Sequence, residues 1–284
     1  MKLISASCCM PAKTGTTPGK VYGVARARAP EGTVAMDYLA TAVERALERA
    51  KCSAAELDLI VSLSWSPDHL VADTRIMGPR IGHPLQKKIG ASNAFVFDLM
   101  DASLAKALYV VNQFAISQAV QRILVVRADI GQGLNSDPQS GFAIPDGAFA
   151  LLLEPDAQQQ FSSIDIGAGF QPLRVDLNTQ IFSAADAKGT LCFPHQSELD
   201  EAICHAVEAL NKPFGFALDN VLHECWLSHE TGRPHCLGPF DLAFQLEMCM
   251  EFKCEPILAT SFDPFNLRVE GVTLAIAGGS YDGC

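Results

Sequence analysis

The chain has 284 residues, of which 49 % are hydrophobic and 19 % charged, and its formal net charge is −11. This composition is typical of a globular protein with a large core and excludes a disordered chain. The acidic charge and the lack of a basic run argue against nucleic acid or a membrane surface as the partner. No apolar run approaches the roughly 20 residues of a membrane-spanning helix. The apolar part of the opening MKLISASCC is too short for a signal peptide, so we expect a cytoplasmic protein that begins with a strand.

The ten cysteines are scattered along the chain, and no two form a Cys-x-x-Cys pair. In a cytoplasmic protein we expect reduced thiols that pack as small hydrophobic side chains. His223, Cys225, His229, His235 and Cys236 lie close in sequence, but no pair among them has a familiar zinc spacing. The sequence therefore predicts no metal site and no cofactor.

Apolar periodicity predicts alternating strands and helices in the first half of the chain. After the first strand and a Pro- and Gly-rich loop at 10–33, we expect helices at 36–51, 84–90 and 103–120 and strands at 57–65, 94–99, 122–128 and 148–153. The run LDLIVSLSW at 57–65 is almost continuously apolar, which is typical of a strand buried on both faces of a parallel sheet. Residues 129–145 are expected to form a polar loop.

The second half repeats this pattern after a polar hinge at 154–160. Ser197 and Asp200 have the spacing of a capping box, which predicts a helix from there through Lys212. Residues 170–196 show no regular pattern. A further helix is expected at 239–252, and strands are expected at 162–167, 218–226, 257–262 and 269–276.

Matching residues recur in the two halves at an offset near 161. The pairs keep their order along the chain: Lys51 with Lys212, Leu57-Asp58 with Leu218-Asp219, Trp65 with Trp226, Gly78-Pro79 with Gly238-Pro239, and Phe97-Asp98 with Phe262-Asp263. We therefore expect an α/β protein built from two duplicated halves, residues 1–155 and 156–284.

The junction between the strand at 94–99 and the following helix is the first candidate for chemistry. Its sequence, DLMDAS, ends at Ser103 and places a helix N-terminus in front of the strand. Backbone N–H groups and the helix dipole favour negative charge there, so many α/β enzymes place a nucleophile at such a point. Asp68-His69 is a second candidate, as a general-base pair, although its position after a strand favours a role in a turn.

Several segments, in order along most of the chain, resemble the ketoacyl synthase III group of the thiolase fold. They are AELDLIVSLSWSPD (55–68), GASNAFVFDLMDAS (90–103), ILVVRADI (123–130), PDGAFALLL (145–153), SFDPF (261–265) and GVTLAIAG (271–278). The resemblance implies two α/β halves in αβαβα layers. More specifically, SPDHL, IGHPLQKKIGA, SLAKALYVV, CLGPFDLA and VEGVTL are similar to one subunit of the heterodimeric 2-alkyl-4-quinolone synthases.

The ketoacyl synthase III group uses a cysteine, a histidine and an asparagine, and none of the three is present at the matching positions. Ser103 stands at the cysteine position, Glu224 at the histidine position with His223 one residue earlier, and Pro239 at the asparagine position. A serine without an adjacent base is a poor nucleophile, because almost none of it is ionised at neutral pH. The family's glycine-rich loop reads Phe262-Asp263-Pro264-Phe265, which we expect to fill the active-site space and to remove one N–H. The sequence thus predicts no catalytic residues.

The resemblance implies a heterodimer with a catalytic ketosynthase subunit that binds the acyl thioester and 2-aminobenzoylacetate. An octanoyl-type group carried on the partner's cysteine would condense with 2-aminobenzoylacetate to give a 2-alkyl-4(1H)-quinolone. The residues expected at the interface or pocket entrance are Met77, Pro79, Ile81, His83, Pro84, Phe97 and Ser103. The alternatives are an autonomous acyltransferase or hydrolase that uses Ser103 with His223, and a purely structural or regulatory partner protein.

Overall fold

The computed structural model of the chain describes residues 1–11, 29–64, 81–99, 102–130, 134–136, 145–177, 189–192, 196, 198–224, 238–252 and 255–277. No helix in these ranges is both long and apolar enough to cross a membrane. Met77, Pro79, Asp68 and His69 lie outside the described residues.

A nine-stranded mixed sheet contains most of the strands, in the order β10-β11-β12-β1-β6-β4-β2-β3, with β7 also paired to β12. In its first half the strands are β1 (Lys2–Cys9), β2 (Leu59–Ser62), β3 (Phe95–Asp98), β4 (Ile123–Asp129) and β6 (Gly147–Glu154). In its second half they are β7 (Phe161–Asp165), β10 (Val221–His223), β11 (Ile257–Asp263) and β12 (Arg268–Ile276). Strand β2 is parallel to both β3 and β4, so the expected parallel arrangement around 57–65 is confirmed.

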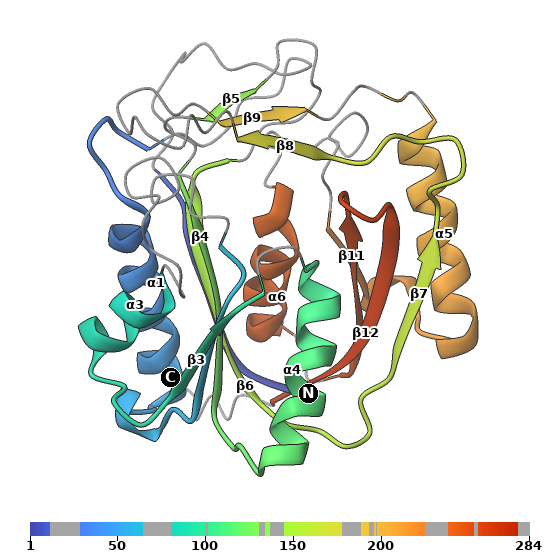
Figure 1. Ribbon diagram of the computed structural model, residues 1–284. Coiled ribbons are helices and arrows are strands. Elements are labelled where there is room, and N and C mark those ends of the chain that lie inside the picture. Colours follow the sequence, from blue (N-terminus) through green and yellow to red (C-terminus); the bar gives the residue numbers. More distant parts are fainter. Residues whose placement is uncertain are drawn as a thin grey trace.

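The helices form three layers, one between the two halves of the sheet and one on the outer side of each half (Figure 1). They are α1 (Ala35–Ala50), α3 (Gly82–Ile89), α4 (Leu104–Gln118), α5 (Leu199–Phe214) and α6 (Asp241–Phe252), with 3₁₀ turns η1 (Ala54–Glu56), η2 (Leu218–Asn220) and η3 (Gly238–Phe240). Figure 1 shows α4 and α6 between the strands of the two halves, with α1 and α3 outside one half and α5 outside the other. This is the αβαβα layering that the family resemblance implies.

The central helices are held by the largest hydrophobic core. Leu108 and Val111 of α4 and Leu246 of α6 are fully buried there against Leu3 of β1 and Ala259 of β11. A second core packs α1 against β4 and β6, and a third packs α5 against β11 and β12. The apolar spacing that predicted the helix at 103–120 is therefore the spacing of its buried face.

Three details differ from the sequence-based expectation. The segments expected to be irregular contain a three-stranded sheet of β5 (Leu134–Ser136), β8 (Arg174–Leu177) and β9 (Gly189–Cys192), whose strands are too short to show a period of two. Of the strand expected at 218–226, only Val221–His223 forms a strand among the described residues, because Leu218–Asn220 form a 3₁₀ turn. Residues 225 and 226 lie outside the described part of the chain. Helix α5 has Glu198 as its N-cap, without a side-chain cap bond, rather than a capping box at Ser197, which lies outside the described residues.

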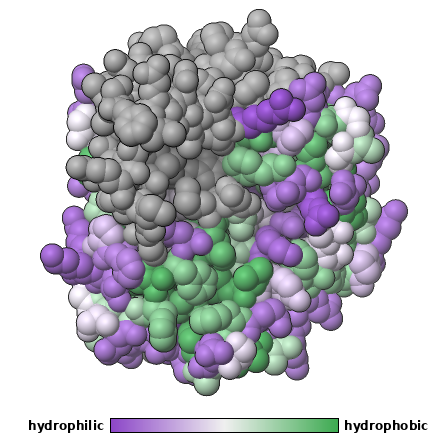
Figure 2. All heavy atoms as spheres, in the orientation of Figure 1, coloured by the Kyte–Doolittle hydropathy of each residue, from purple (hydrophilic) through white to green (hydrophobic). Residues whose placement is uncertain are grey.

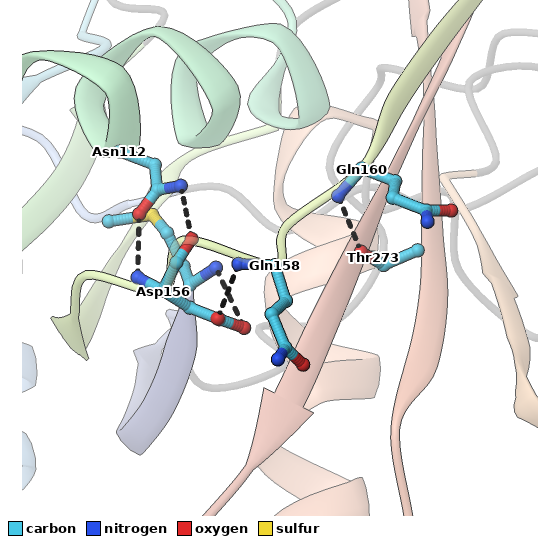
Figure 3. Close-up of polar contacts among 6 residues, drawn as sticks. Asn112, Asp156, Gln158, Gln160 and Thr273 are labelled. Atoms are coloured by element: carbon cyan, nitrogen blue, oxygen red, sulfur yellow. Dashed lines mark hydrogen bonds and ion pairs between the residues drawn. The ribbon is translucent and has the colours of Figure 1, made fainter. Parts of the chain in front are cut away.

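The polar segment between the halves is anchored to α4 by one buried side chain (Figure 3). The fully buried amide of Asn112 donates to the Asp156 carbonyl at 2.8 Å and accepts from the Asp156 N–H at 2.9 Å. The Asp156 carboxylate accepts from the N–H of Gln158, and the N–H of Gln160 donates to Thr273 Oγ1 of β12. This segment is thus tied both to the central helix and to the second half of the sheet. The boundary at 155/156 itself stays a prediction.

We predict that Asn112→Ala destabilises the protein, because it leaves the Asp156 N–H without its partner and the Asp156 carbonyl with only the longer bond from the Gln159 N–H, at 3.3 Å. An unsatisfied buried group costs about 1–3 kcal/mol, so the free energy of unfolding should fall by roughly 1–3 kcal/mol. Urea unfolding followed by circular dichroism measures this. The exposed neighbour Gln113→Ala is the matched control and should change stability by less than about 0.5 kcal/mol. Equal effects of the two variants would contradict the anchoring role.

Candidate functional site

Ser103 is the N-cap of α4. Its backbone is extended, its Oγ accepts from the N–H of Lys106 at 3.2 Å, and only 7 % of the residue is exposed. The hydroxyl in turn donates to Oε2 of Glu270, at 2.5 Å. The oxygen thus has two protein partners, and neither of them is a base of the histidine type.

The next N–H groups of the α4 N-terminus also have partners within the chain. The N–H of Ala105 donates to Ser261 Oγ at 2.9 Å, and that of Ala107 donates to the Ser103 carbonyl. In a ketosynthase-type site, donors at such a terminus stabilise the charge that develops on a thioester. Here the donors of residues 105, 106 and 107 are already satisfied by the two serines.

Glu270 closes the site from the second half of the sheet. It lies opposite Ser261 in the β11–β12 ladder, so both side chains face α4. Glu270 is only 3 % exposed, and this burial raises the pKa of its carboxyl, as does the charge of Asp263, while the Ser103 hydrogen bond acts in the opposite direction. Sequence reasoning missed this residue. Its one signal is a charged side chain inside the otherwise apolar strand RVEGVTLAI.

The size of the repulsion between two negative charges decides whether a side chain at position 103 can be ionised. Two like charges 4 Å apart repel by about 4 kcal/mol at an effective dielectric constant of 20. A helix N-terminus stabilises a negative charge by about 0.3–1 kcal/mol, and by roughly 2 kcal/mol at best. With Glu270 ionised, an anion at position 103 would therefore be disfavoured, since the Ser103 oxygen lies 2.5 Å from Oε2 of Glu270.

His223 lies on the opposite face of the sheet from Ser103. Its Nδ1 is 2.9 Å from Thr260 Oγ1, and Thr260 packs beside Leu210 of α5. The next residue, Ser261, contacts α4 instead, because successive side chains of a strand point to opposite faces. The sheet therefore separates Ser103 from His223, and the geometry does not bring together the pair that the autonomous hydrolase alternative requires.

The positions predicted to match the family's histidine and asparagine are also buried. Glu224 is 2 % exposed, and its N–H donates to the Thr260 carbonyl at 3.0 Å, which extends the pairing of β10 by one residue. Pro239 lies in the buried η3 turn, followed by Phe240, whose ring packs edge-on against Phe149 at 6.2 Å between centroids. An apolar turn thus stands at the position where the family has an amide side chain.

The β11–β12 connection differs from the expectation in one respect. Phe262 faces α5, where it packs in the third core, so it does not fill the space in front of α4. Asp263 accepts from the N–H groups of Phe265 and Asn266 at 2.9 and 3.1 Å and closes the turn locally. The side chain that reaches Ser103 is that of Glu270, which lies on β12 after the hairpin turn.

The surface around β3 is apolar, as Figure 2 shows over β3 and α4. Strand β3 is an edge of the nine-stranded sheet in the described part of the chain, and its Phe95 is 71 % exposed. Val110 and Ile116 of α4 are also exposed, and the half-buried Phe97 packs on Phe114. An edge strand beside exposed apolar side chains is a surface suited to pairing with another chain.

Of the interface residues expected between positions 77 and 84, those that the structure describes are only partly available for contact. Ile81 is 1 % exposed and belongs to the core around α1, so the structure contradicts its predicted place at the interface. His83 and Pro84 are exposed in α3, and His83 Nδ1 lies 3.3 Å from Gln86 Oε1. Among the described residues, no group of three or more His, Cys, Asp or Glu side chains could hold a metal ion. Burial raises the pKa of the thiols of Cys8, Cys9 and Cys52, which argues against any of these as an activated nucleophile.

We predict that Glu270→Gln stabilises the protein at neutral pH but not in acid. A carboxyl whose pKa is raised on folding holds its proton more tightly in the folded state, so the wild type loses stability as the pH rises through that pKa. The amide removes this loss and still accepts from Ser103. Urea unfolding at pH 4 and pH 7.5 should show a larger gain for the variant at pH 7.5. A gain that does not change with pH would contradict this, and exposed Glu251→Gln is the control.

The comparisons with known proteins agree with this fold. No family model matches the chain. It is 45 % identical over 262 residues, 90 % of its length and 91 % of the relative's, to the 2-heptyl-4(1H)-quinolone synthase subunit PqsB of Pseudomonas aeruginosa. The chain shares its fold with the solved structure of the priming β-ketosynthase of the R1128 polyketide pathway, with a TM-score of 0.70 and 18 % identity over 97 % of this chain and 96 % of that one. It also shares its fold with β-ketoacyl-[acyl-carrier-protein] synthase III of Thermus thermophilus, with a TM-score of 0.71 and 16 % identity over 98 % of this chain and 100 % of that one. The chain therefore has the thiolase-like fold of the ketoacyl synthases and belongs to the PqsB family.

Proposed function

We propose that this chain is the non-catalytic subunit of a heterodimeric acyltransferase that makes 2-alkyl-4(1H)-quinolones. The observation that carries the proposal is the closed N-terminus of α4, where Ser103 donates to Glu270 and the side chains of Ser103 and Ser261 accept from the N–H groups of Lys106 and Ala105. The relative PqsB, named as a subunit of a quinolone synthase, supports the choice of pathway.

The chemistry takes place on a partner of the PqsC type, which carries the cysteine and histidine that this chain lacks. An octanoyl-type group on the partner's cysteine is transferred to the nucleophilic carbon of 2-aminobenzoylacetate. The new C–C bond forms as the thiolate leaves and the β-carboxylate is lost as carbon dioxide. The aromatic amine then attacks the new carbonyl and water is lost, which closes the quinolone ring. The partner binds both substrates.

This chain contributes a surface rather than a reactive group. Thiolase-fold dimers join their sheets edge to edge near the nucleophile helices, and β3 with the first turns of α4 is the corresponding surface here. Phe95 of β3 and Val110 in the second turn of α4 supply exposed apolar area on it, and Phe97 of β3 packs on Phe114 of α4. Since both the strand and the helix are packed into the central core, the surface is rigid and loses little entropy on binding.

We predict that the purified chain alone shows no acyl transfer, and that Ser103→Ala in the complex leaves quinolone formation within about twofold of wild type. The reason is that the hydroxyl serves as a helix cap, whose loss costs about 1 kcal/mol of stability rather than a catalytic step. Product formation is measured by mass spectrometry at a temperature where melting curves show the variant folded. Turnover by the chain alone, or loss of activity in the variant complex, would reject the proposal. Full quinolone synthesis by the partner without this chain would favour a purely regulatory role.

We predict that Phe95→Glu weakens the heterodimer at least about tenfold, because a charge is then buried against apolar surface. Leu218→Glu is the matched control: this leucine is 80 % exposed, but it lies next to β10 at the opposite edge of the sheet. Titration calorimetry with the partner measures both dissociation constants. The interface assignment fails if the two variants bind alike.

A further inference from the structure

We propose that Glu270 is an internal block of the α4 N-terminus, an inhibitory contact that would keep even a cysteine at position 103 unreactive. The inference rests on the proposed function, in which this site is silent. It adds that the silence has two separate causes: the missing thiol and the glutamate. Restoring the nucleophile alone would then not restore its reactivity.

The geometry places the glutamate where a reacting group would have to be. Its Oε2 lies 2.5 Å from Ser103 Oγ, and both residues are less than a tenth exposed. Ser261, the cross-strand neighbour of Glu270, holds the N–H of Ala105. The side chains from β11 and β12 therefore cover the helix terminus from the same side, and the carboxyl reaches the position-103 side chain.

The charges around the carboxyl leave it able to repel an anion. From α4 it faces Ser103 and Lys106, from β11 it faces Ser261 and Asp263, and Arg268 lies on its own strand; β7 places Ser163 opposite it. The ammonium of Lys106 lies over the ring of Phe161, 4.7 Å from its centroid. A second negative charge at position 103 would therefore meet the carboxylates of Glu270 and Asp263.

The test compares Ser103→Cys with Ser103→Cys/Glu270→Gln in the full chain. Iodoacetamide reacts with the thiolate of residue 103: a C–S bond forms, iodide leaves, and the thiol proton passes to the buffer. The rate at this residue is followed by peptide mass spectrometry at pH 7.5. Glutamine has nearly the same size as glutamate, so access to the thiol is unchanged, while the negative charge is removed and an amide NH2 takes the place of one carboxylate oxygen.

The expected result is at least about tenfold faster alkylation in the double variant, which corresponds to a thiol pKa lower by one unit or more. Ser103→Cys/Glu251→Gln removes an exposed carboxylate from the C-terminal turn of α6, and it should react like Ser103→Cys. Equal rates with and without Glu270 would overturn the proposal.

A second measurement needs only the single variant and covers the case in which the double variant does not fold. The alkylation rate of Ser103→Cys against pH should have its midpoint above the ordinary thiol value of about 8.5, whereas a midpoint below it would overturn the block. Neither readout depends on quinolone synthesis. If the chain alone were found to turn over while these results held, the proposed function would fail and the block would stand.

Discussion

The first turn of α4 has backbone N–H groups that no residue of the helix can satisfy, and the architecture of the site follows from how they are satisfied. In an acyltransferase of this fold such groups are left for the reacting thioester. In this chain Ser261 accepts from the N–H of Ala105 and Ser103 from that of Lys106, and Glu270 accepts from Ser103. A terminus that is satisfied internally is stable without a ligand, and for the same reason it has little left to offer to a substrate. The position is thus a structural joint between α4 and the β11–β12 hairpin.

This joint matters because α4 carries part of the proposed interface and packs on β3 through Phe114 and Phe97. The helix is fixed at its N-terminus by the hairpin and at its centre by Asn112, which anchors the segment between the halves. Val110 is exposed between these two points and Ile116 beyond them, and Phe114 packs on Phe97 of the edge strand β3. The buried contacts at the N-terminus of α4 and at Asn112 stabilise the helix whose exposed side chains form part of the surface that we propose for a partner.

Much of this could be predicted from the sequence, because apolar periodicity and motif order are local signals. The central helix, the buried strands around 57–62 and 123–129 and the thiolase-like layering are of this kind. The short strands β5, β8 and β9 could not be predicted, since three or four residues carry no clear period. The bond between Ser103 and Glu270 joins residues 167 positions apart, so neither residue's neighbours in the sequence point to the other. The burial of Ile81 and the outward direction of Phe262 likewise depend on which face of an element packs inward.

The central claim is that this chain supplies a surface and its partner supplies the nucleophile. The most direct test is to incubate the purified heterodimer with octanoyl-CoA, without the second substrate, and to measure the intact mass of each subunit. The account predicts that the octanoyl increment appears on the partner alone. An octanoyl group on this chain, mapped to Ser103, would contradict it.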